Sequence, residues 1–454
     1  MTAVALSSSP SPVASILVVT YGGWEWCRRA LEAVARNTDV PHEVIVVDNA
    51  SPDGTGERLR DEVRGATVIL NPRNVGFGPA VNQAAAVARG RFLALLNPDA
   101  EVQPGWLPLL VEALRRRRDV GAVVGRLLNV DGSLQEAGSL LWSDGSTLAL
   151  GVGADPSDPA YRFSFSSDYG SAACLLIRRS TFLDEGGFDA AYLPAYCEDV
   201  DLALRLRERG LRVLYEPRAA AVHARFASSG EDGAARLIER NRQVLRSRWA
   251  GALAGRIAPP DEDHPHRTVA GRDADALDRI VVAAPSTPMA TLLELARRFP
   301  EDRVTWLATG GRPDAEAIDE LAEAGVEVAV PERAAAWLDE RLFHFSAVVL
   351  LGAGAAAVVV DELEAAQPQA EVVYAFDGPP RDASLRRAEV TALRRAASVV
   401  CANEAERRFA SELCPGEVRV DADADLPSVL VAELRRLGFA GDLAAPPAGT
   451  APRP

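Results

Sequence analysis

The chain has 454 residues. A single hydrophobic core usually supports a shorter chain, so this length predicts two domains. Its composition, 48% hydrophobic and 25% charged, is that of a globular protein and excludes a chain disordered throughout. The formal net charge of −15 argues against a nucleic-acid partner, because a broad nucleic-acid footprint needs a basic stripe to replace the counterions of the phosphates.

The cysteines and the longest apolar run indicate the compartment. The five cysteines are scattered and form no Cys-x-x-Cys pair, which argues against a zinc ribbon or a disulfide framework and fits a reducing cytoplasm. The longest apolar stretch, residues 345–360, is shorter than the roughly 20 residues that a membrane-spanning helix needs. We therefore expect a cytoplasmic protein, with at most a peripheral association with the inner face of the cell membrane.

Changes in composition predict the domain boundaries. The Ser- and Pro-rich residues 1–14 predict a disordered leader without a signal-peptide pattern. Residues 15–255 alternate strand and helix patterns, and the charged, Pro-bearing residues 256–277 predict a linker. A second alternating region covers residues 278–438, and the Ala- and Pro-rich residues 439–454 predict a flexible tail.

Short apolar runs in the first region end abruptly at polar residues. Runs over 16–19, 44–47 and 92–96 predict strands, and helical patterns cover 24–36 and 79–89. This alternation predicts parallel strands packed between helices. In open sheets of this class, ligands bind beyond the carboxyl ends of the strands. We therefore expect a site around the polar residues that follow the three runs, Thr20-Tyr21, Asp48-Asn49 and Asn97-Pro98-Asp99.

The second region predicts another sheet of the same class. Its strand patterns alternate with helical ones, which is typical of a Rossmann-like parallel sheet. The pattern contains no evident Gly-rich phosphate loop, because Gly310-Gly311 is only a turn signal. We expect a non-catalytic module for acceptor binding, docking or oligomerisation. The predicted strands cover residues 280–283, 304–307, 326–330, 347–351, 372–376 and 398–401.

A series of motifs in the first region resembles the family 2 inverting glycosyltransferases of the GT-A fold, in their rhamnosyltransferase-like branch. The order and spacing of the motifs match from Val18 to His223. The resemblance implies a Rossmann-like mixed sheet with helices on both faces. Residues 373–377 and 386–406 faintly resemble the N-terminal half of a GT-B glycosyltransferase. The family motifs are Val18-Val19-Thr20-Tyr21, Val46 to Thr55, Asn74 to Asn82, Leu96 to Ala100, Gly187-Phe188-Asp189, Glu198 to Leu202 and His223.

The resemblance assigns a set of donor-binding residues. It gives Asp48 the role of accepting a hydrogen bond from the N3–H of uracil or thymine. Asp53-Gly54 is a turn signal, and a plain turn explains it equally well. Residues 74–82 form a Gly-bearing loop that feeds a helix, and a helix N-terminus suits phosphate. The donor-binding set is Thr20, Tyr21, Asp48, Asn49, Ser51, Asp53, Asn74, Gly76, Phe77, Asn82, Asn97 and Asp99.

Asn97-Pro98-Asp99 stands where many family members carry a D-x-D metal motif, with asparagine in place of the first aspartate. Asp99 is then the carboxylate expected to bind Mg²⁺ or Mn²⁺, which prefer oxygen ligands and substrate phosphates. His223 matches the late histidine ligand of the family. A lone histidine is more often structural, but its position after the acidic motif favours a ligand.

Glu198-Asp199-Val200-Asp201 opens a helical pattern that stops at Gly210. The resemblance makes Asp199 the general base, with Glu198 beside it in the catalytic pair, and repulsion among the carboxylates should raise one pKa. Capping of the helix is an alternative, because the macrodipole favours carboxylates there. Asp201 and Arg205 are spaced for a helical ion pair. Residues 170–174 are expected to form a strand on the acceptor side.

The predicted function is transfer of a hexosyl or deoxyhexosyl group, such as rhamnosyl, from a UDP- or dTDP-sugar. The acceptor would be a hydroxyl of a glycan, a lipid-linked intermediate or a small molecule. Two alternatives are a sugar nucleotidyltransferase and a non-catalytic nucleotide-sugar-binding protein on a related fold. The first normally has a Gly-rich motif with Arg and Lys, which residues 21–24 lack. The joint presence of Asp48, Asp99, Asp199 and His223 counts against the second.

Overall fold

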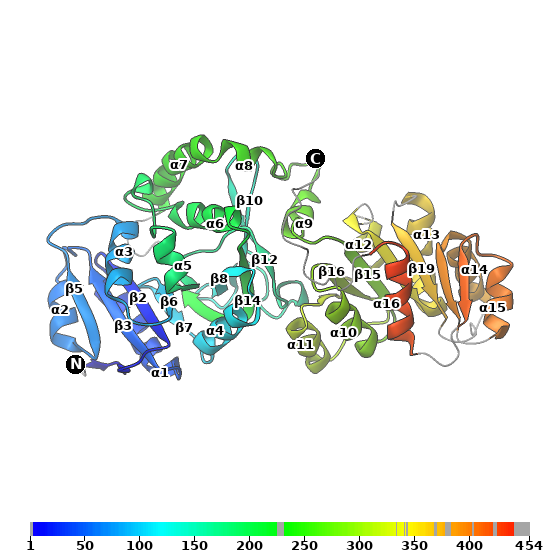
Figure 1. The fold of residues 1–454 in the computed structure, drawn as a ribbon, viewed down its shortest axis with the longest axis horizontal. Helices are drawn as coiled ribbons and strands as arrows, with labels where there is room; N and C mark the ends of the chain where they lie inside the picture. The colour runs from blue at the N-terminus through cyan, green and yellow to red at the C-terminus, as the bar shows by residue number, and fades with distance from the viewer. Residues whose placement is uncertain are drawn as a thin grey trace. The chain divides into compact units, whose positions relative to one another are not determined.

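The fold was analysed in a computed structural model, which describes residues 3–224, 231–332, 334–339, 341, 344–366, 370–376, 383–401, 404–420 and 425–439. The chain forms two compact units, Met1–Arg272 and Asp273–Pro454. Each unit has its own sheet and its own hydrophobic core (Figure 1). They are therefore treated separately.

The first unit alternates strands and helices in its N-terminal half and becomes richer in strands after α4. Its strands are β1 (Val4–Ala5), β2 (Ala14–Thr20), β3 (His42–Asp48), β4 (Val63–Arg64), β5 (Ala66–Leu70), β6 (Phe92–Leu96), β7 (Ala100–Val102), β8 (Val120–Leu128), β9 (Leu134–Glu136), β10 (Ser139–Leu141), β11 (Thr147–Ala149), β12 (Phe165–Ser167), β13 (Cys174–Arg178) and β14 (Arg212–His223). Its α-helices are α1 (Trp24–Asn37), α2 (Thr55–Glu62), α3 (Phe77–Val87), α4 (Trp106–Arg116), α5 (Arg179–Asp184), α6 (Glu198–Glu208), α7 (Glu231–Arg248), α8 (Ala250–Ala254) and α9 (Arg267–Arg272).

The main sheet of this unit is mixed. In its described part the strand order is β12-β14-β8-β13-β6-β2-β3-β5, with β7 paired to β14 and β9 paired to β8. The strands β6, β2, β3 and β5 are parallel, and β13 runs antiparallel to both β6 and β8. This arrangement confirms the predicted Rossmann-like mixed sheet.

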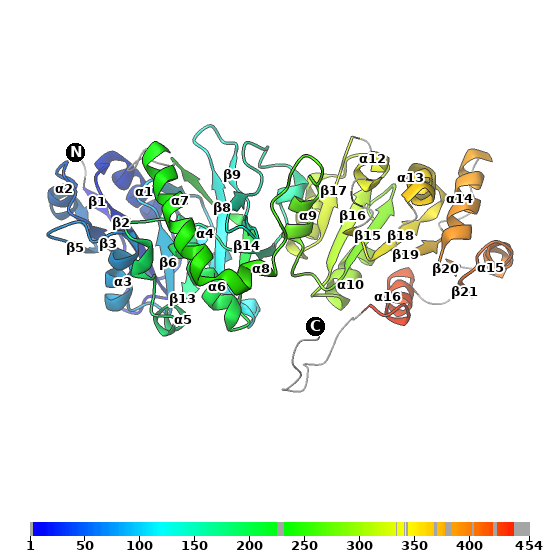
Figure 2. The same cartoon turned by 90° about the horizontal axis from the view of Figure 1, so that it is seen from above.

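The apolar runs form strands because both of their faces are buried. Every residue of β2 and β3 is buried, as expected for parallel strands covered by helices on both sides (Figure 2). On one face, Ile16 and Val18 pack in a core with Leu31 of α1 and Leu110 of α4. Helix α3 contacts β2 and β3 through its small residues, including Ala84. The predicted strands over 16–19, 44–47 and 92–96 are therefore present.

The prediction of a disordered leader is wrong for residues 3–13. Strand β1 pairs in parallel with β4, and the N–H of Leu6 donates to the carbonyl of Arg64. The side chains of Val4 and Leu6 are buried in the main core. The Ser- and Pro-rich composition gives no sign that these two apolar residues are buried, or that β1 and β4 form a separate two-stranded sheet.

The ends of four strands bring distant parts of the chain to one edge of the sheet. Thr20 at the end of β2 pairs with Asp48 at the end of β3. Leu96 at the end of β6 pairs with Cys174, the first residue of the antiparallel β13. Residues 170–173 therefore form a loop at this edge, and the predicted strand over 170–174 begins only at Cys174. His223 at the end of β14 pairs with Ala100 in the short strand β7.

Part of the predicted linker packs on the first unit. Arg256 donates to the carbonyl of Leu141 and forms a 2.6 Å ion pair with Asp168. In α9, Gly271 lies against Trp142, because a Cβ placed on that glycine would approach the ring to 2.9 Å. The boundary between the compact units then falls after Arg272.

The second unit contains a parallel sheet. Across its described residues the strand order is β17-β16-β15-β18-β19-β20-β21, with parallel pairing throughout. Counted from β15 as the first strand, this order begins 3-2-1-4-5-6, which is the Rossmann arrangement. The prediction of a second Rossmann-like domain is confirmed, and β21 is a strand that the sequence patterns missed. Residues 440–454 of the predicted tail and part of the GT-B-like segment lie outside the described residues.

The elements of the second unit alternate regularly. Its strands are β15 (Arg279–Ala284), β16 (Arg303–Ala308), β17 (Glu327–Ala329), β18 (Ala347–Leu351), β19 (Glu371–Ala375), β20 (Ser398–Cys401) and β21 (Glu417–Val420). Its helices are α10 (Met289–Arg298), α11 (Ala315–Glu323), α12 (Ala334–Asp339), α13 (Gly352–Ala366), α14 (Ala383–Arg395), α15 (Glu404–Ser411) and α16 (Leu426–Arg436).

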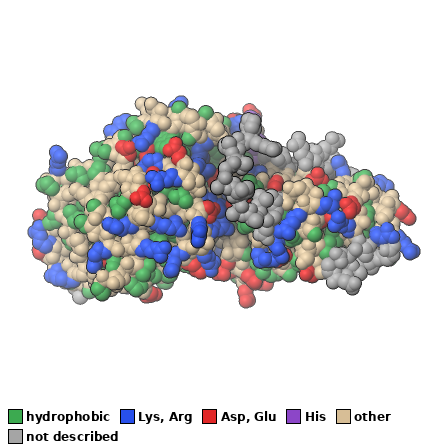
Figure 3. Space-filling model, viewed as in Figure 1, with side chains coloured by type: hydrophobic (Ala, Val, Ile, Leu, Met, Phe, Trp, Pro, Cys, Tyr) green, Lys and Arg blue, Asp and Glu red, His purple; other side chains and the backbone are tan. Residues whose placement is uncertain are grey.

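The surface carries charges of both signs. On the face drawn in Figure 3, blue basic and red acidic side chains are both scattered over the first unit. Some belong to ion pairs along helices, such as Arg28 with Glu32 in α1. Among the helices that the structure describes, we find none with the length and apolarity that crossing a bilayer requires.

Candidate functional site

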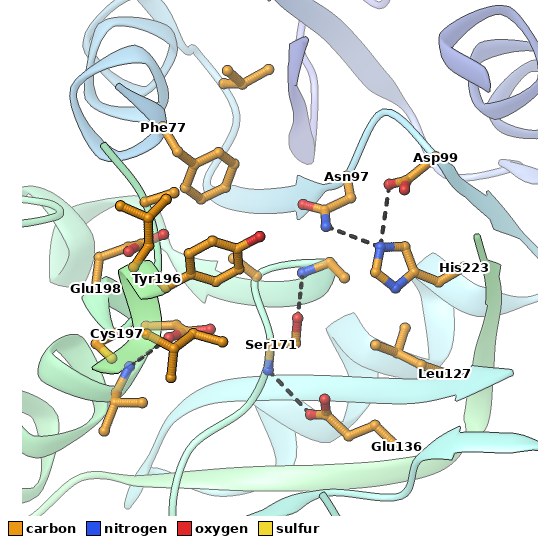
Figure 4. A pocket seen from close by; sticks show the side chains of 18 of the residues that line it. Phe77, Asn97, Asp99, Leu127, Glu136, Ser171, Tyr196, Cys197, Glu198 and His223 are labelled. Carbon is orange, nitrogen blue, oxygen red and sulfur yellow. Dashed lines mark hydrogen bonds and ion pairs between the residues drawn. The ribbon is translucent and has the colours of Figure 1, made fainter. Parts of the chain in front are cut away.

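A cavity of about 750 Å³ lies at the edge where β2, β3 and β6 end. Its wall combines strand ends, the loop before α3, the loop before β13 and the start of α6 (Figure 4). Many of the residues predicted for the site line it, although they come from distant parts of the sequence. These are Thr20, Tyr21, Asn49, Asn74, Phe77, Asn97, Asp99, Glu198, Asp199 and His223.

Asn49 ties the end of β3 to the glycine loop. Its Oδ1 accepts hydrogen bonds from Asn71 Nδ2 and from the N–H of Val75, at 3.1 and 3.0 Å. Its Nδ2 donates to Asn74 Oδ1 at 2.9 Å and to the carbonyl of Gly76 at 3.2 Å. Both amide atoms of Asn49 therefore shape the loop that enters α3.

Gly76 closes this loop in a conformation that requires glycine. Its φ is 91°, and a Cβ at this position would lie 2.2 Å from Leu193. The next residue, Phe77, donates its N–H to the carbonyl of Pro194 and begins α3. Gly76 itself does not line the cavity, and its role is to bring Phe77 to the cavity wall.

One carboxylate oxygen of Asp48 accepts no hydrogen bond from any described residue. The side chain is buried at the end of β3, and its Oδ2 accepts the N–H of Ser51 at 3.2 Å. Its Oδ1 is buried and has no hydrogen-bond partner among the described residues. An orphaned carboxylate oxygen is costly to bury, so this position suits a ligand that donates an N–H.

Ser51 and Asp53 hold the turn that follows β2. Ser51 Oγ accepts the N–H of Gly22 at 2.7 Å, and Asp53 Oδ2 accepts the N–H of Gly23 at 2.8 Å. Asp53 Oδ1 also accepts from the hydroxyl of Thr55 at 2.6 Å. Neither Ser51 nor Asp53 lines the cavity. Their contacts position the turn next to Tyr21, whose exposed ring does line it.

Asn82 lies apart from the cavity-lining residues and is committed to another contact. Its Nδ2 donates to the carbonyl of Phe188 at 2.8 Å, and its Oδ1 accepts the N–H of the same residue at 2.9 Å. A Cβ on Gly187 would lie 2.2 Å from that Oδ1. Asn82 therefore contacts the segment Gly187-Phe188 with both of its amide atoms, and its donor-binding role stays a prediction.

Asp99 and His223 meet at the cavity wall, and both are buried. Asp99 Oδ1 lies 3.2 Å from His223 Nε2, and Asn97 Nδ2 lies 3.1 Å from the same nitrogen (Figure 4). On the other side of the ring, Nδ1 lies 2.6 Å from Gln135 Oε1. Because an amide oxygen only accepts, Nδ1 carries the proton and donates to Gln135.

In the neutral ring this tautomer leaves Nε2 with a lone pair that accepts from Asn97 Nδ2, and Asp99 Oδ1 lies beside the same nitrogen. Two acceptors 3.2 Å apart repel each other unless a proton or a cation lies between them. Gln135 is held in turn, since its Nε2 donates to the carbonyl of His223 and to Asn129 Oδ1. A histidine oriented by a hydrogen bond at its far nitrogen is typical of a metal ligand. No group of three or more His, Cys, Asp and Glu side chains suited to a metal occurs among the described residues.

Glu198 and Asp199 stand at the first turn of α6, on the far side of the cavity from β6. The helix begins after two left-handed residues, Tyr196 with φ 77° and Cys197 with φ 71°. Such values are uncommon for residues with side chains and are found disproportionately at functional sites. The ring of Tyr196 projects into the cavity next to Phe77, with its hydroxyl on the side where Asn97 lies (Figure 4).

The two carboxyls of this turn differ in their surroundings. Glu198 is buried, its Oε2 has no hydrogen-bond partner among the described residues, and burial together with the charge of Asp199 raises its pKa well above the usual value. Burial, and to a smaller extent the charge of the nearby Glu136, raise the pKa of Asp199 to about 6, although the N–H of Val200 donates to this carboxylate. Because the charge of Asp199 raises the pKa of Glu198, ionisation of Asp199 disfavours loss of the proton from Glu198, which favours Asp199 as the base.

Asp201 has a structural role. It is fully buried, and its Oδ1 accepts hydrogen bonds from the Tyr192 hydroxyl at 3.0 Å and from Trp249 Nε1 at 2.9 Å. Its Oδ2 accepts from Arg205 Nε at 2.8 Å, so the predicted helical ion pair is present. Arg248 Nε also lies 3.4 Å from Oδ1. With its oxygens occupied, Asp201 has no free lone pair directed at a substrate.

Several cavity residues were missed from the sequence. Gln135 and Glu136 come from the short strand β9, and Glu136 accepts the N–H of Ser171 at 3.2 Å. An apolar lip is formed by Leu148, Val152, Leu237 and Ile238, of which Val152 is 59% and Ile238 37% exposed. Leu148 belongs to β11, Val152 to the turn after it, and Leu237 and Ile238 to α7. The sequence of these segments shows no pattern that indicates a site.

Comparison with known proteins gives the family. Residues 15–155 match the family described as Glycosyl transferase family 2. The N-acetylglucosaminyl-diphospho-decaprenol L-rhamnosyltransferase of Mycobacterium tuberculosis is 30% identical over 244 residues, which cover 49% of this chain and 79% of that protein. Rhamnosyltransferase WbbL of Escherichia coli (strain K12) is 25% identical over 221 residues, covering 46% of this chain and 82% of that protein.

Solved structures with similar folds include GalNAc-T7 with UDP, GalNAc and Mn²⁺, with a TM-score of 0.41 and 16% identity over 52% of this chain and 48% of that chain. Mannosyltransferase PcManGT from Pyrobaculum calidifontis in complex with GDP-Man and Mn²⁺ has a TM-score of 0.38 and 21% identity over 58% of this chain and 72% of that chain.

Proposed function

The chain belongs to glycosyltransferase family 2, and from this premise we propose that its first unit transfers a hexosyl or deoxyhexosyl group from a UDP- or dTDP-sugar with inversion. A rhamnosyl group is the leading candidate, because relatives covered over most of their length are rhamnosyltransferases. The observation that carries the proposal is one cavity that holds both the Asp99–His223 pair and Asp199, a carboxylate whose raised pKa suits a general base.

The nucleotide base is proposed to bind at Asp48. The buried Oδ1 needs a donor, and the N3–H of uracil or thymine supplies one at the position where adenine has none. Thr20 and Asn49 flank this strand end and line the cavity, so a nucleotide bound at Asp48 would direct its diphosphate towards Asn97 and Asp99. UDP- and dTDP-sugars are therefore the expected donors.

A divalent cation, Mg²⁺ or Mn²⁺, fits the Asp99–His223 pair. The carboxylate oxygen and the unprotonated Nε2 face each other, and Gln135 holds the ring in the required tautomer. Such a cation would neutralise charge on the departing diphosphate when bound. With Asn97 in place of an aspartate, the protein supplies few charged ligands, so the donor's diphosphate oxygens would complete the shell.

The chemical step is a single displacement. Asp199 takes the proton from the acceptor hydroxyl as the acceptor oxygen forms a bond to the anomeric carbon of the donor sugar. The bond between that carbon and the diphosphate oxygen breaks, and the electron pair leaves with the nucleoside diphosphate. Because the attack is opposite to the leaving group, the anomeric configuration inverts. Glu198, which keeps its proton, leaves the negative charge of the pair on Asp199.

The acceptor is proposed to be a lipid-linked glycan that enters past the apolar lip of Leu148, Val152, Leu237 and Ile238. Exposed side chains of this kind around a polar cavity mark a surface that binds apolar groups. One relative is named for an acceptor joined to decaprenol through a diphosphate. The apolar lip could contact the first isoprene units while the glycan reaches Asp199. A peripheral position on the membrane surface in the cytoplasm would suit such an acceptor.

The second unit is proposed to be a non-catalytic module for acceptor docking or oligomerisation. Every residue assigned to donor, cation or base lies in the first unit. Sheets with the Rossmann strand order often bind nucleotides in a crevice at the carboxyl ends of their strands. In the second unit, however, the loops after β15 and β16 have no Gly-rich phosphate motif.

The test combines donor binding with product analysis. UDP- and dTDP-sugars are titrated by calorimetry with and without Mn²⁺, and transfer to a polyprenyl-diphosphate sugar is followed by mass spectrometry and NMR of the new linkage. We expect metal-dependent donor binding and a product with inverted configuration. Retention of configuration would contradict the single displacement. Pyrophosphate release from a nucleoside triphosphate and a sugar phosphate would instead indicate a nucleotidyltransferase, and binding without turnover would indicate a binding protein.

A further inference from the structure

Asn241 of α7 is fully buried beneath the loop that leads into the catalytic helix α6. Its Nδ2 lies 2.8 Å from each of three backbone carbonyl oxygens, those of Tyr192, Ala195 and Tyr196. Its Oδ1 accepts from Arg240 Nε at 3.0 Å. The side-chain amide of Asn241 thus contacts three backbone carbonyls. All three belong to the five residues before Cys197, where no helix or strand supplies their hydrogen bonds.

The loop that Asn241 holds has an unfavourable backbone. Tyr196 and Cys197 both occupy the left-handed region, which is unfavourable for a residue with a side chain and persists only where neighbours enforce it. These two residues set the direction of the first turn of α6. They therefore determine where the carboxylate of Asp199 lies and why the ring of Tyr196 projects into the cavity (Figure 4).

A second contact from the same part of the chain holds the other side of this turn. Trp249, directly after α7, donates to Asp201 in α6 at 2.9 Å, and Arg248 lies 3.4 Å from the same carboxylate oxygen. Leu245 and Trp249 also pack with Val200 and Leu204 in one apolar cluster. The turn that carries Glu198 and Asp199 is thus fixed before it by Asn241 and after it by Trp249.

We propose that Asn241 is a positioning residue for the general base, acting through the carbonyls of Tyr192, Ala195 and Tyr196. The inference rests on the proposed function of Asp199. Asn241 does not line the cavity, so it exerts its effect by fixing the backbone and not by touching substrate. Displacing a reacting group by about 1 Å costs on the order of 10²-fold in rate, which makes the effect measurable.

The test compares two Asn241 variants with a matched control. Asn241→Ala removes the amide, and Asn241→Asp keeps its size but replaces the N–H donors with an acceptor that repels the three carbonyls. Gln243→Ala removes an exposed amide from the same helix and serves as the control. For both Asn241 variants we expect kcat to fall at least about 10-fold, with the donor dissociation constant changed less than about twofold and the control unchanged.

Two outcomes would overturn the proposal. In the first, kcat stays within about twofold of wild type in both Asn241 variants. In the second, donor affinity and kcat fall together, which indicates general damage to the unit. If Asn241→Ala does not fold, Asn241→Ser, which keeps one donor, takes its place under the same criteria.

Hydrogen exchange separates this inference from the function on which it rests. The amides of Val200 and Asp201 should exchange faster in Asn241→Ala than in Gln243→Ala, whether or not the protein turns over a sugar. If wild type transfers no sugar but exchange at these amides responds to Asn241, the proposed function fails and the positioning contact stands. Unchanged exchange at these amides would overturn the positioning itself.

Discussion

Asp99 Oδ1 and His223 Nε2 lie 3.2 Å apart, because Asp99 directly precedes β7 and Ala100 of β7 pairs with His223 at the end of β14. The ring is oriented from behind by Gln135, which accepts from Nδ1 and donates to the carbonyl of His223. A carboxylate and an imidazole lone pair thus face each other in the same cavity as the acidic turn of α6. This relationship makes the cation site testable without any turnover.

Gln135→Ala should weaken Mn²⁺ binding in the presence of UDP by about 10- to 100-fold, because the His223 ring loses the contact that fixes its tautomer. The measurement is a calorimetric Mn²⁺ titration of the UDP complex. Gln103→Ala is the control, since its Nε2 donates to the carbonyl of Glu101, away from the histidine. Equal Mn²⁺ affinity in wild type and Gln135→Ala would show that His223 is not a ligand.

His223→Ala and Asp99→Ala should lower affinity for the donor diphosphate more than for the free nucleoside. A chelator should abolish transfer by wild type, and added Mg²⁺ or Mn²⁺ should restore it. Full activity in the chelator would rule out the cation and leave a cationic side chain to stabilise the leaving group.

Asp199→Asn should lower kcat by on the order of 10² or more, because a positioned proton acceptor is lost while the cavity keeps its shape. Donor affinity should stay near the wild-type value, since the donor residues lie on other elements. Glu208→Gln, at the exposed end of the same helix, is the control. Near-normal transfer by Asp199→Asn, measured by product formation under saturating donor, would transfer the base role to Glu198.

The pH dependence follows from the pKa of Asp199, which burial raises to about 6. A base must be unprotonated, so kcat should rise with pH through about 6 and then level off. The charge of Glu136 contributes to this raised pKa. Glu136→Gln, which keeps an oxygen for the N–H of Ser171, should therefore shift the acidic limb of the kcat profile to lower pH. A limb that does not move would mean that another group titrates there.

The sequence predicted the parts of the site that depend on strand ends. Thr20, Asp48 and Asn97 follow buried apolar runs, and parallel pairing necessarily brings such ends to one edge. Gln135 and Asn241 could not be predicted in this way. Each acts through a contact between elements far apart in the chain, and the residues near them show no pattern that specifies the partner.

The contacts of Asn82 and of the N-terminal residues could not be predicted from the sequence for a related reason. The motif that contains Asn82 matches the family, but the side chain points to Phe188, a contact that depends on how α3 packs against the segment before α6. Residues 3–13 are rich in Ser and Pro, and composition alone cannot reveal that Val4 and Leu6 are buried against β4 and the core.

We expect Glu198 to make the free energy of unfolding depend on pH. Its folded pKa is raised well above the usual 4.5 by burial and by the charge of Asp199, whereas the unfolded carboxyl ionises near that value. Folding then takes up a proton, so the contribution is fully present below pH 4.5 and is lost as pH rises towards the folded pKa. Glu198→Gln removes this dependence. We expect the Tm of Glu198→Gln relative to wild type to increase from pH 4.5 to pH 8.

The exposed Glu208→Gln gives the baseline for this comparison, because its Tm difference from wild type should not vary over the same range. Differential scanning calorimetry at a series of pH values supplies both curves. A Glu198→Gln difference that stays flat, or that shrinks as pH rises, would mean that Glu198 is ionised in the folded protein and competes with Asp199 for the role of base.

The last prediction concerns where the first unit ends. A chain truncated after Pro259 lacks α9, and the ring of Trp142, now covered by Gly271, becomes exposed. A chain truncated after Arg272 keeps that cover. Both keep Arg256 and its ion pair with Asp168. We therefore expect the longer chain to fold and bind UDP- or dTDP-sugars, and the shorter one to have a lower Tm.

Calorimetric titration of the longer chain with the donor tests whether the first unit alone binds the donor. Every residue assigned to donor, cation and base lies before Arg272. The donor affinity of the longer chain should match that of the full chain, while transfer to a lipid-linked acceptor falls if the second unit docks that acceptor. A well-folded 1–272 chain that binds neither UDP- nor dTDP-sugar would show that the donor site has been placed in the wrong unit. If it binds the donor and transfers at the full rate, the second unit has no part in acceptor docking, and oligomerisation is the remaining role to test.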